Sequence, residues 1–212
     1  MFSLKPKVKD QPEIEQILNF QPEGWWQNAR RFLWEVSKVV VISVAIILPI
    51  RYFLIQPYYV KGASMEPNYY DHDYLIVDEI SFRFRDPARG EVIVFRYPLD
   101  PRQYFIKRVI GLPEETVKIA GGRVYIYNKA NPQGFELDEP YLNGAKTFTA
   151  TGKNYEKVLG SEELFVMGDN RPASLDSRVF GTLPLKYIIG RTWVRGWPFD
   201  RLAIFAVPEY SN

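Results

Sequence analysis

The chain has 212 residues, of which 46% are apolar and 25% charged, a composition that indicates a folded protein and excludes global disorder. Its formal net charge of +2, without a basic block interleaved with aromatic residues, argues against a nucleic-acid partner. The absence of cysteine excludes thiol catalysis, disulfides and thiolate metal sites, and a single histidine argues against a multi-histidine zinc site.

Residues 1–31 carry scattered prolines and charges with little hydrophobic periodicity. We predict a loosely ordered tail here, with Trp25 and Trp26 near its end. A tryptophan pair at this place is typical of a bilayer interface, and docking on the body of the protein is the alternative.

Residues 32–55 are dominated by apolar side chains, most densely from Val39 to Ile50. A membrane-spanning helix needs about 20 residues, so a span must extend past Lys38 or Arg51, whose long side chains can reach the lipid headgroups. We predict a transmembrane anchor over 32–55, because a soluble helix of this length does not need apolar residues on every face. The alternative is a buried helix or strand of a soluble core.

The flanking charges predict how this anchor is oriented. Arg30, Arg31 and Lys38 precede or enter the run, and fewer basic residues follow it, so the positive-inside rule places residues 1–31 in the cytoplasm. Everything after about Tyr58 is then expected on the far side. The run lies far from residue 1 and ends without a small-x-small site, which favours an uncleaved anchor over a cleaved export signal.

After the anchor, short β-rich runs alternate with turn residues, and no amphipathic helix of ordinary length follows residue 56. The sequence Ala120-Gly121-Gly122 between two such runs predicts a hairpin. We predict a mainly β, antiparallel, sheet-rich fold. Its core is expected from residues 56–113 and 163–212, with 114–162 inserted as a β flap or subdomain.

Three polar segments interrupt this pattern, and the first contains Ser64. Gly62 before it and Pro67 after it indicate a tight, exposed bend rather than a regular strand. Such a bend can present the serine hydroxyl and leave nearby amides free as an oxyanion hole. A turn serine without a chemical role is the alternative.

The second segment supplies a base for that serine, whose hydroxyl is a poor nucleophile until its proton is removed. Lys107 lies between apolar neighbours in the strand-like run 104–110, where burial would lower its pKa from about 10.4 and leave a neutral amine. Lys107 and Arg108 point to opposite faces of a strand, so one can be buried while the other stays solvated or paired. A lysine on a solvated face is the alternative.

The third segment, residues 168–178, is the most specific. Apolar runs enter and leave it, which predicts that its backbone passes through the core and that its polar side chains need partners. Ser174 is a natural partner for Lys107. A charged surface loop is the alternative, and His72, in an acidic turn, is interpreted as a solvated loop residue rather than a triad member.

Together these segments make the chain resemble bacterial type I signal (leader) peptidases, in the short, single-anchor style of cyanobacteria, Gram-positive bacteria and organelles. The resemblance extends from about residue 32 to the C-terminus, with the motifs in the family's order. The motifs are Ser64-Met65-Glu66-Pro67, Lys107-Arg108-Val109-Ile110-Gly111-Leu112-Pro113, and Gly168-Asp169-Asn170-Arg171 followed by Ser174, Asp176-Ser177-Arg178 and Gly181.

The resemblance implies a membrane-bound serine endopeptidase that removes signal peptides from exported preproteins after a small-x-small motif such as Ala-x-Ala. Ser64 would form an acyl-enzyme and Lys107 would be the general base, with no metal or cofactor. The implied partners are signal peptides, the lipid bilayer and the protein-export machinery. The implied location is the bacterial cytoplasmic membrane or the thylakoid membrane.

The resemblance also assigns supporting roles. Ser174 would hold the lysine amine, and Asp176 and Arg178 would pair to brace the site. Arg108, Asp169 and Asn170 would support it. The backbone at Ser64 and Gly62 would form the oxyanion hole. The implied substrate-binding residues are Val60, Met65, Tyr69, Phe105 and Ile106.

Three positions depart from the family pattern. Gly62 stands where some members have a hydroxyl residue, so an oxyanion hole of backbone amides is expected. Asn68-Tyr69 replaces the usual Thr-Leu, which is expected to reshape the pocket for the residue before the cut. Pro172-Ala173 replaces a polar pair. No catalytic group is lost.

Two other functions fit parts of the sequence. A soluble, self-cleaving repressor-type Ser/Lys protease shares the chemistry but needs an N-terminal DNA-binding module, where this chain has an apolar run. An anchored β-domain that binds partners without catalysis would tolerate loss of Ser64 and Lys107.

Overall fold

A computed structural model describes residues 23–49, 55–149 and 152–206 of the chain. The chain divides into two compact units, residues 1–48 and 49–212, and each is described by itself.

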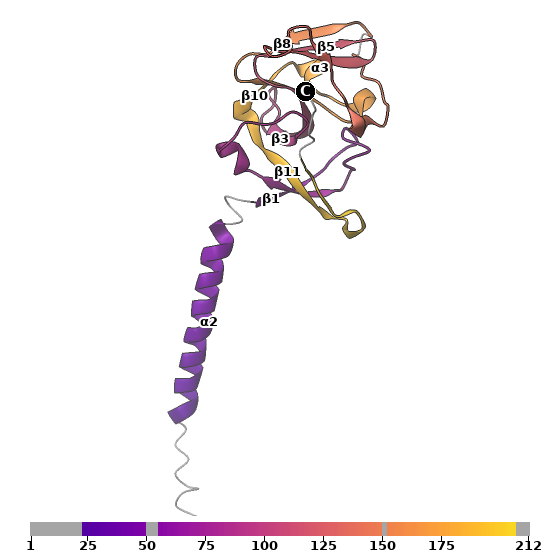
Figure 1. The fold of residues 1–212 in the computed structure, drawn as a ribbon. Coiled ribbons are helices and arrows are strands. Elements are labelled where there is room, and N and C mark those ends of the chain that lie inside the picture. Colours follow the sequence, from indigo (N-terminus) through magenta and orange to yellow (C-terminus); the bar gives the residue numbers. More distant parts are fainter. Residues whose placement is uncertain (1–22, 50–54, 150–151, 207–212) are drawn as a thin grey trace, which may run out of the picture. The chain divides into compact units, whose positions relative to one another are not determined.

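The described part of the first unit is one helix, α2, from Glu23 to Pro49 (Figure 1). The sequence contains no proline between Pro22 and Pro49, so every interior residue can donate its backbone hydrogen bond. Residues 23–31 are therefore helical, and the prediction of a loose tail is wrong for them. The earlier part of the predicted tail, 1–22, lies outside the described residues.

The predicted anchor is only partly a helix. Residues 32–49 belong to α2, residues 50–54 lie outside the described residues, and Ile55 already starts the first strand. In the described part of the chain, no helix is both long enough and apolar enough to cross a membrane.

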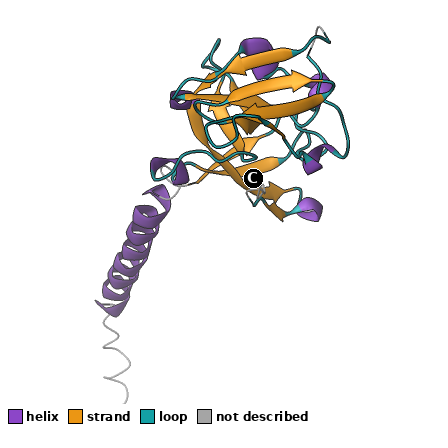
Figure 2. Ribbon diagram, turned by 45° about the horizontal axis from the view of Figure 1, so that its top comes forward, coloured by secondary structure: helices purple, strands orange, loops and turns teal. Residues whose placement is uncertain are grey.

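The second unit is built mainly of antiparallel strands, which confirms the predicted fold class (Figure 2). Its larger sheet has the order β1-β2-β11-β3-β4-β9-β10, and β12 pairs with β11. The strands of this sheet are β1 (Ile55–Tyr59), β2 (Tyr74–Asp78), β3 (Val92–Arg96), β4 (Tyr104–Gly111), β9 (Glu163–Met167), β10 (Leu183–Pro184), β11 (Ile188–Trp197) and β12 (Ala203–Ile204).

A second antiparallel sheet lies at the opposite end of this unit from β1, at the top of Figure 1. Its order is β7-β6-β5-β8. Ala120 pairs with Arg123 at the end of the β5–β6 ladder, which confirms the predicted hairpin. The strands are β5 (Thr116–Ala120), β6 (Arg123–Tyr127), β7 (Phe135–Glu136) and β8 (Tyr155–Val158), all within residues 114–162.

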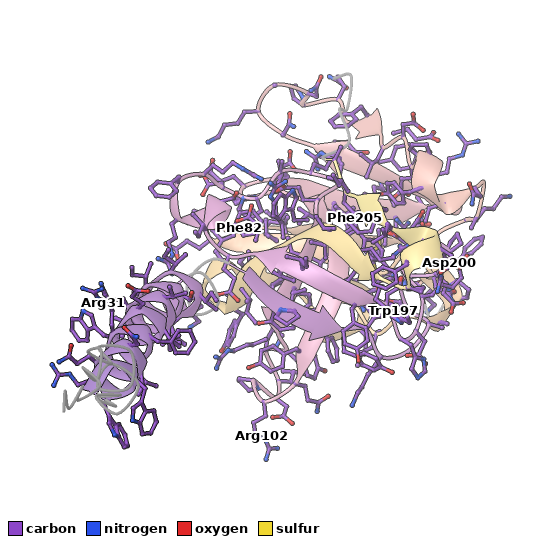
Figure 3. All side chains as sticks on the ribbon, turned by 90° about the horizontal axis from the view of Figure 1, so that it is seen from below. Arg31, Phe82, Arg102, Trp197, Asp200 and Phe205 are labelled. Atoms are coloured by element: carbon purple, nitrogen blue, oxygen red, sulfur yellow. The ribbon has the colours of Figure 1, made fainter. Side chains whose placement is uncertain are left out.

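Helices in this unit are short and lie in the connections. They are η2 (Ser81–Arg83), η3 (Pro140–Leu142), η4 (Arg171–Ala173), α3 (Ser177–Phe180), η5 (Leu185–Tyr187) and η6 (Phe199–Arg201). Trp197 is the last residue of β11, and Asp200 lies in η6, in the turn between β11 and β12 (Figure 3).

A shared core joins the two sheets. Ile110 of β4 and Phe165 of β9 are fully buried and belong to one cluster with Val117 and Ile126 of the second sheet. Burial of each such side chain contributes about 1.5–3 kcal/mol. This packing fixes β4 and β9 side by side, and both carry site residues: Lys107 lies on β4, and the segment 168–178 starts where β9 ends.

Candidate active site

The segment around Ser64 forms the compact bend that the sequence predicts. Gly62 has a φ of +88°, which only glycine adopts without strain. The backbone N–H of Asn68 and that of Tyr69 both donate to the Met65 carbonyl, at 3.1 and 2.9 Å. This turn leaves the Ser64 side chain half-buried at the edge of a groove.

Lys107 reaches Ser64 from β4. Its Nζ lies 2.8 Å from Ser64 Oγ and 2.7 Å from the carbonyl oxygen of Ile106. The lysine is 4% exposed, whereas lysine is among the residues least often buried in proteins. The predicted proximity of serine and lysine is thus present in the structure.

The electrostatic setting of Lys107 suits a base. Burial lowers the pKa of its amine from 10.5 to about 8, because desolvation disfavours the ammonium form. The nearby carboxylates of Asp176 and Asp169 oppose this shift. Roughly a tenth of such amines are neutral at pH 7, about three hundred times more than for a solvated lysine. The side chain is therefore ready to accept a proton from Ser64.

Arg108, the next residue, is also buried, but it keeps its charge and is stabilised by an ion pair. It projects from β4 to the opposite face, is 7% exposed, and cannot lose its proton. Its Nε and Nη2 donate to the two carboxylate oxygens of Asp169 at 2.8 and 2.6 Å. A third bond runs to the Gly90 carbonyl, and the Tyr141 ring lies 4.0 Å from the guanidinium. One strand thus holds an amine of lowered pKa on one face and a paired cation on the other.

The segment 168–178 clamps the backbone of the serine bend. The Asn170 N–H donates to the Ser64 carbonyl at 3.0 Å, and its side-chain amide donates to the Ala63 carbonyl at 3.0 Å. A Cβ on Gly168 would lie 2.4 Å from the Ser64 carbonyl oxygen and 2.2 Å from Ser174 Oγ. Only glycine allows β9 to end this close to the nucleophile.

Asp176 and Arg178 form a buried ion pair in the same segment. Arg178 Nε and Nη2 donate to Asp176 at 2.8 and 2.7 Å, and the Gly168 N–H donates to the same carboxylate at 3.0 Å. Arg178 also donates to the carbonyls of Arg171 and Phe148. This pairing ties both ends of the segment together, as the predicted bracing role requires.

Two predicted roles differ from what the structure places there. Ser174 Oγ is buried but, among the described residues, has no hydrogen-bond partner; the lysine amine contacts Ile106 instead. The Gly62 N–H donates to Asp71 Oδ1 at 2.8 Å, so it is not free for an oxyanion. In the described chain no acceptor contacts the Ser64 N–H, which leaves it as the available oxyanion donor.

The serine and lysine lie in a groove of about 700 Å³. Val60, Phe105 and Ile106 line it, as predicted for substrate contacts. Its other walls come from β1 to β4, the serine bend and the third segment: Tyr58, Tyr59, Lys61, Gly62, Ala63, Leu75, Val94, Gln103, Tyr104, Ala173 and Leu175.

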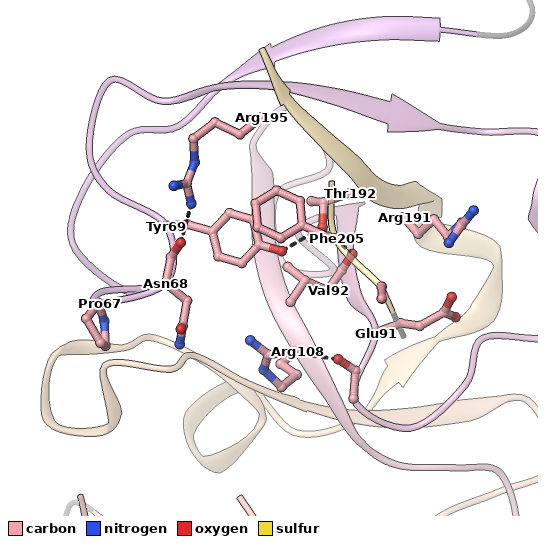
Figure 4. A pocket seen from close by; sticks show the side chains of 12 residues that line it. Pro67, Asn68, Tyr69, Glu91, Val92, Arg108, Arg191, Thr192, Arg195 and Phe205 are labelled. Carbon is pink, nitrogen blue, oxygen red and sulfur yellow. Dashed lines mark hydrogen bonds between the residues drawn. The ribbon is translucent and has the colours of Figure 1, made fainter. Parts of the chain in front are cut away.

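Met65 and Tyr69, which the resemblance assigns to substrate binding, do not line this groove. Both are at most 2% exposed because the turn after Ser64 folds them inward. Tyr69 stacks near Phe205 with ring centroids 4.5 Å apart, and its hydroxyl lies 2.9 Å from Thr192 Oγ1 (Figure 4). Met65 and Tyr69 thus pack in the core beneath the bend that carries Ser64.

Several contacts were not found from the sequence. Asn68 donates to both Asp169 and the Tyr141 carbonyl at 2.9 Å, and so joins the bend to the ion pair beneath it. The buried pair of Arg171 and Glu139 ties the third segment to the connection after β7. No sequence signal marks partners this far apart.

His72 has a 73% exposed side chain beside Asp71 and does not line the groove, in line with its interpretation as a solvated loop residue. In the described residues, no group of three or more histidine, aspartate or glutamate side chains could hold a metal ion.

Comparison with known proteins identifies the family. Residues 33–197 match the family model described as signal peptidase, peptidase S26. The chain belongs to this family. The family predicted from the three motifs is thereby confirmed, and the self-cleaving repressor alternative loses support.

Individual relatives agree with this assignment. The chain is 38% identical to "Signal peptidase I" of Leptolyngbya laminosa over 89% of its length and 91% of that protein. It is 35% identical to "Probable signal peptidase I-2" of Synechocystis sp., in an alignment that covers 86% of this chain and 78% of that protein. It is 31% identical to "Signal peptidase I" of Bacillus caldolyticus, in an alignment that covers 84% of this chain and 95% of that protein. A solved signal peptidase I from Enterococcus faecalis aligns with 50% of the chain at 30% identity and a TM-score of 0.42.

Proposed function

We propose that the protein is a serine endopeptidase that cleaves signal peptides from exported preproteins after a small-x-small motif, through a Ser64–Lys107 dyad. The observation that carries the proposal is the 2.8 Å contact between Ser64 Oγ and the buried Lys107 amine, whose pKa is lowered to about 8. Membership of the peptidase family supports the reaction class, and the names of the relatives support the substrate class.

In the proposed acylation step, Ser64 Oγ attacks the scissile carbonyl carbon and its proton passes to the neutral Nζ of Lys107. The Ile106 carbonyl and the field of Asp176 stabilise the new ammonium. The Ser64 N–H donates to the oxygen that becomes negative. Lys107 then gives its proton to the departing amine as the C–N bond breaks, which leaves the signal peptide esterified to Ser64.

Deacylation repeats the proton transfers with water. Lys107, neutral again, removes a proton from a water molecule that attacks the ester carbonyl. The C–O bond to Ser64 breaks, and the lysine returns the proton to Ser64 Oγ. The carboxyl end of the signal peptide is released and both side chains regain their starting protonation states.

The shape of the groove supports an extended substrate. The register of β4 with β9 begins at Arg108, so residues 104–107 have one backbone edge without a strand partner. A substrate segment can add to that edge as a strand, with main-chain hydrogen bonds giving affinity. Alternate side chains of a strand point the same way, so the first and third residues before the cut would face the groove and the second would face solvent. This alternation accounts for a motif with a free central position.

We expect the purified full chain, in neutral detergent, to cut a preprotein with an Ala-x-Ala motif at one bond, located by mass spectrometry. Ser64→Ala should lower kcat/KM by about 10³-fold or more, because the nucleophile is lost. The matched control is Ser161→Ala, an exposed serine outside the groove, which should leave the rate unchanged. Cleavage that survives Ser64→Ala, or none by the parent chain, contradicts the proposal.

We further propose that α2 associates with a lipid bilayer. Its apolar side chains from Val39 to Leu48 are exposed, a surface that is costly in water. The full chain should sediment with phosphatidylcholine vesicles, and 1 M salt should not release it because the contact is apolar. Protein left in the supernatant at low salt contradicts this part of the proposal.

A further inference from the structure

A second pocket, of about 710 Å³, lies between η2, the β3–β4 turn and the start of β11. It is separate from the catalytic groove, although Tyr58 and Tyr104 line both. Three of its lining residues are basic and one is acidic, so it carries a net charge of +2 when all four are ionised. The lining residues are Tyr58, Glu79, Phe82, Arg83, Arg96, Pro101, Tyr104, Lys186, Tyr187, Ile188 and Ile189.

The arginines of this pocket differ from the other arginines in the same unit. Among the described residues from 83 to 201, every arginine forms an ion pair with a carboxylate except Arg83 and Arg96. Lys186, in the same pocket, also has no ion pair in the described chain. The two unpaired arginines thus meet in one cavity, together with an unpaired lysine. That arrangement leaves a site for an anion from outside the chain.

Aromatic rings hold the cations in place and form the walls. The Arg96 guanidinium lies 5.8 Å from the Tyr104 ring, and the Lys186 amine lies 5.4 Å from the Tyr187 ring. Phe82, labelled in Figure 3, adds an apolar wall. Rings beside cations give a pocket that accepts both a charged group and the carbon skeleton attached to it.

Glu79 shares a hydrogen bond with the Tyr58 side chain and lies in the field of Arg83, but one of its carboxylate oxygens is left without a partner in the described chain. Its Oε1 is buried and has no hydrogen-bond partner among the described residues. A buried carboxylate oxygen gains stability from a donor. A ligand that joins an anionic group to a hydroxyl would satisfy the cations and this oxygen together.

Two exposed apolar side chains lie close in the sequence to residues that line the pocket. Phe84, which follows Arg83, is 84% exposed, and Leu99, two residues before Pro101, is 71% exposed. Leu99 belongs to the β3–β4 turn whose end carries Arg102 (Figure 3). A basic pocket bordered by exposed apolar side chains is typical of a surface that meets lipid headgroups.

We propose that this pocket binds the headgroup of an anionic phospholipid of the phosphatidylglycerol type. The phosphate lies among Arg83, Arg96 and Lys186, and a glycerol hydroxyl donates to Glu79 Oε1. Phe84 and Leu99 contact the acyl region. The inference rests on the proposed bilayer association of α2, and does not require that the chain cleave preproteins.

The chain order supports a lipid rather than a soluble phosphate. Tyr58 of the pocket follows Pro49, the end of α2, by nine residues. Nine extended residues reach about 30 Å at most, so a bilayer that holds α2 stays within reach of the pocket. A free phosphate would leave Phe84 and Leu99 without a role.

The test uses the full chain in neutral detergent, titrated with dioctanoyl phosphatidylglycerol, with bound lipid counted by native mass spectrometry. The triple variant Arg83→Gln, Arg96→Gln, Lys186→Gln is expected to weaken binding about 100-fold, since each basic residue at an anionic surface contributes about a fivefold gain. The control variant Arg123→Gln, Lys129→Gln, Lys153→Gln removes the same charge from exposed positions outside the pocket and should change the Kd less than about 2-fold.

Two further ligands separate the possible sources of phosphate. Inorganic phosphate and glycerophosphoglycerol, which lacks acyl chains, should each bind at least about tenfold more weakly than the lipid. Equal binding of either one overturns the lipid assignment in favour of a soluble anion. Equal weakening by the pocket and control variants overturns the site itself. Unfolding temperatures of both variants verify that they are folded. Preprotein cleavage is measured in a separate assay, so the lipid-binding result can be interpreted even if the peptidase proposal fails.

Discussion

Replacement of Lys107 by methionine is expected to lower kcat/KM for preprotein cleavage by about 10³-fold or more while the fold is retained. Methionine keeps most of the buried aliphatic volume, so the side chain still fills the space beside Phe105. It removes the amine that contacts Ser64 Oγ at 2.8 Å. Steady-state kinetics on a purified preprotein measures the loss, and Lys118→Met on β5, outside the groove, is the matched control.

The pH profile of the parent protein tests the same amine independently. The pKa of Lys107 is lowered to about 8 by burial, and the base must be neutral to accept a proton. Activity should therefore rise with pH up to about 8 and level off above it. In the Lys107→Met variant the residual rate should lose this step. A rise centred near 10.5 would show a solvated lysine and contradict the dyad.

The nucleophile and its base could be predicted from the sequence because local chemistry defines them. Gly62 and Pro67 around Ser64 require a bend whatever the rest of the fold does. Strand alternation separates Lys107 from Arg108, and the apolar neighbours of Lys107 favour its burial, whereas the sequence leaves Arg108 either solvated or paired. The structure adds that the arginine, which cannot become neutral, is paired with Asp169, whereas burial lowers the pKa of the lysine.

The finer contacts depend on tertiary packing and could not be predicted. Met65 and Tyr69 looked like groove residues because they adjoin Ser64, but the turn hydrogen bonds rotate them into the core. The Gly62 N–H was expected to be free for the oxyanion, but in the structure it donates to the Asp71 carboxylate. Ser174 looked like the partner of the lysine, whose amine instead contacts the carbonyl next to it in the chain, Ile106. Each of these contacts depends on backbone and side-chain dihedral angles that cannot be read from the sequence.

Asp169→Ala is expected to reduce the free energy of unfolding by about 3–5 kcal/mol, since it leaves the buried Arg108 charge without its partner. Asp169 is 2% exposed, accepts two bonds from Arg108, and accepts a third from Asn68. Arginine cannot relieve the strain by losing its proton, so the penalty falls on stability. Urea unfolding of the full chain in neutral detergent, followed by tryptophan fluorescence, measures it.

The double variant Arg108→Met, Asp169→Leu distinguishes loss of the pair from general damage to the site. Apolar residues of similar volume often replace a buried ion pair at little cost, so this variant should recover most of the lost stability. Asp100→Ala, which breaks the exposed pair with Arg102, should leave the unfolding midpoint unchanged. If the double variant is as unstable as Asp169→Ala, the carboxylate matters for another reason: the Asn68 contact, which joins it to the serine bend, would then be the dominant one.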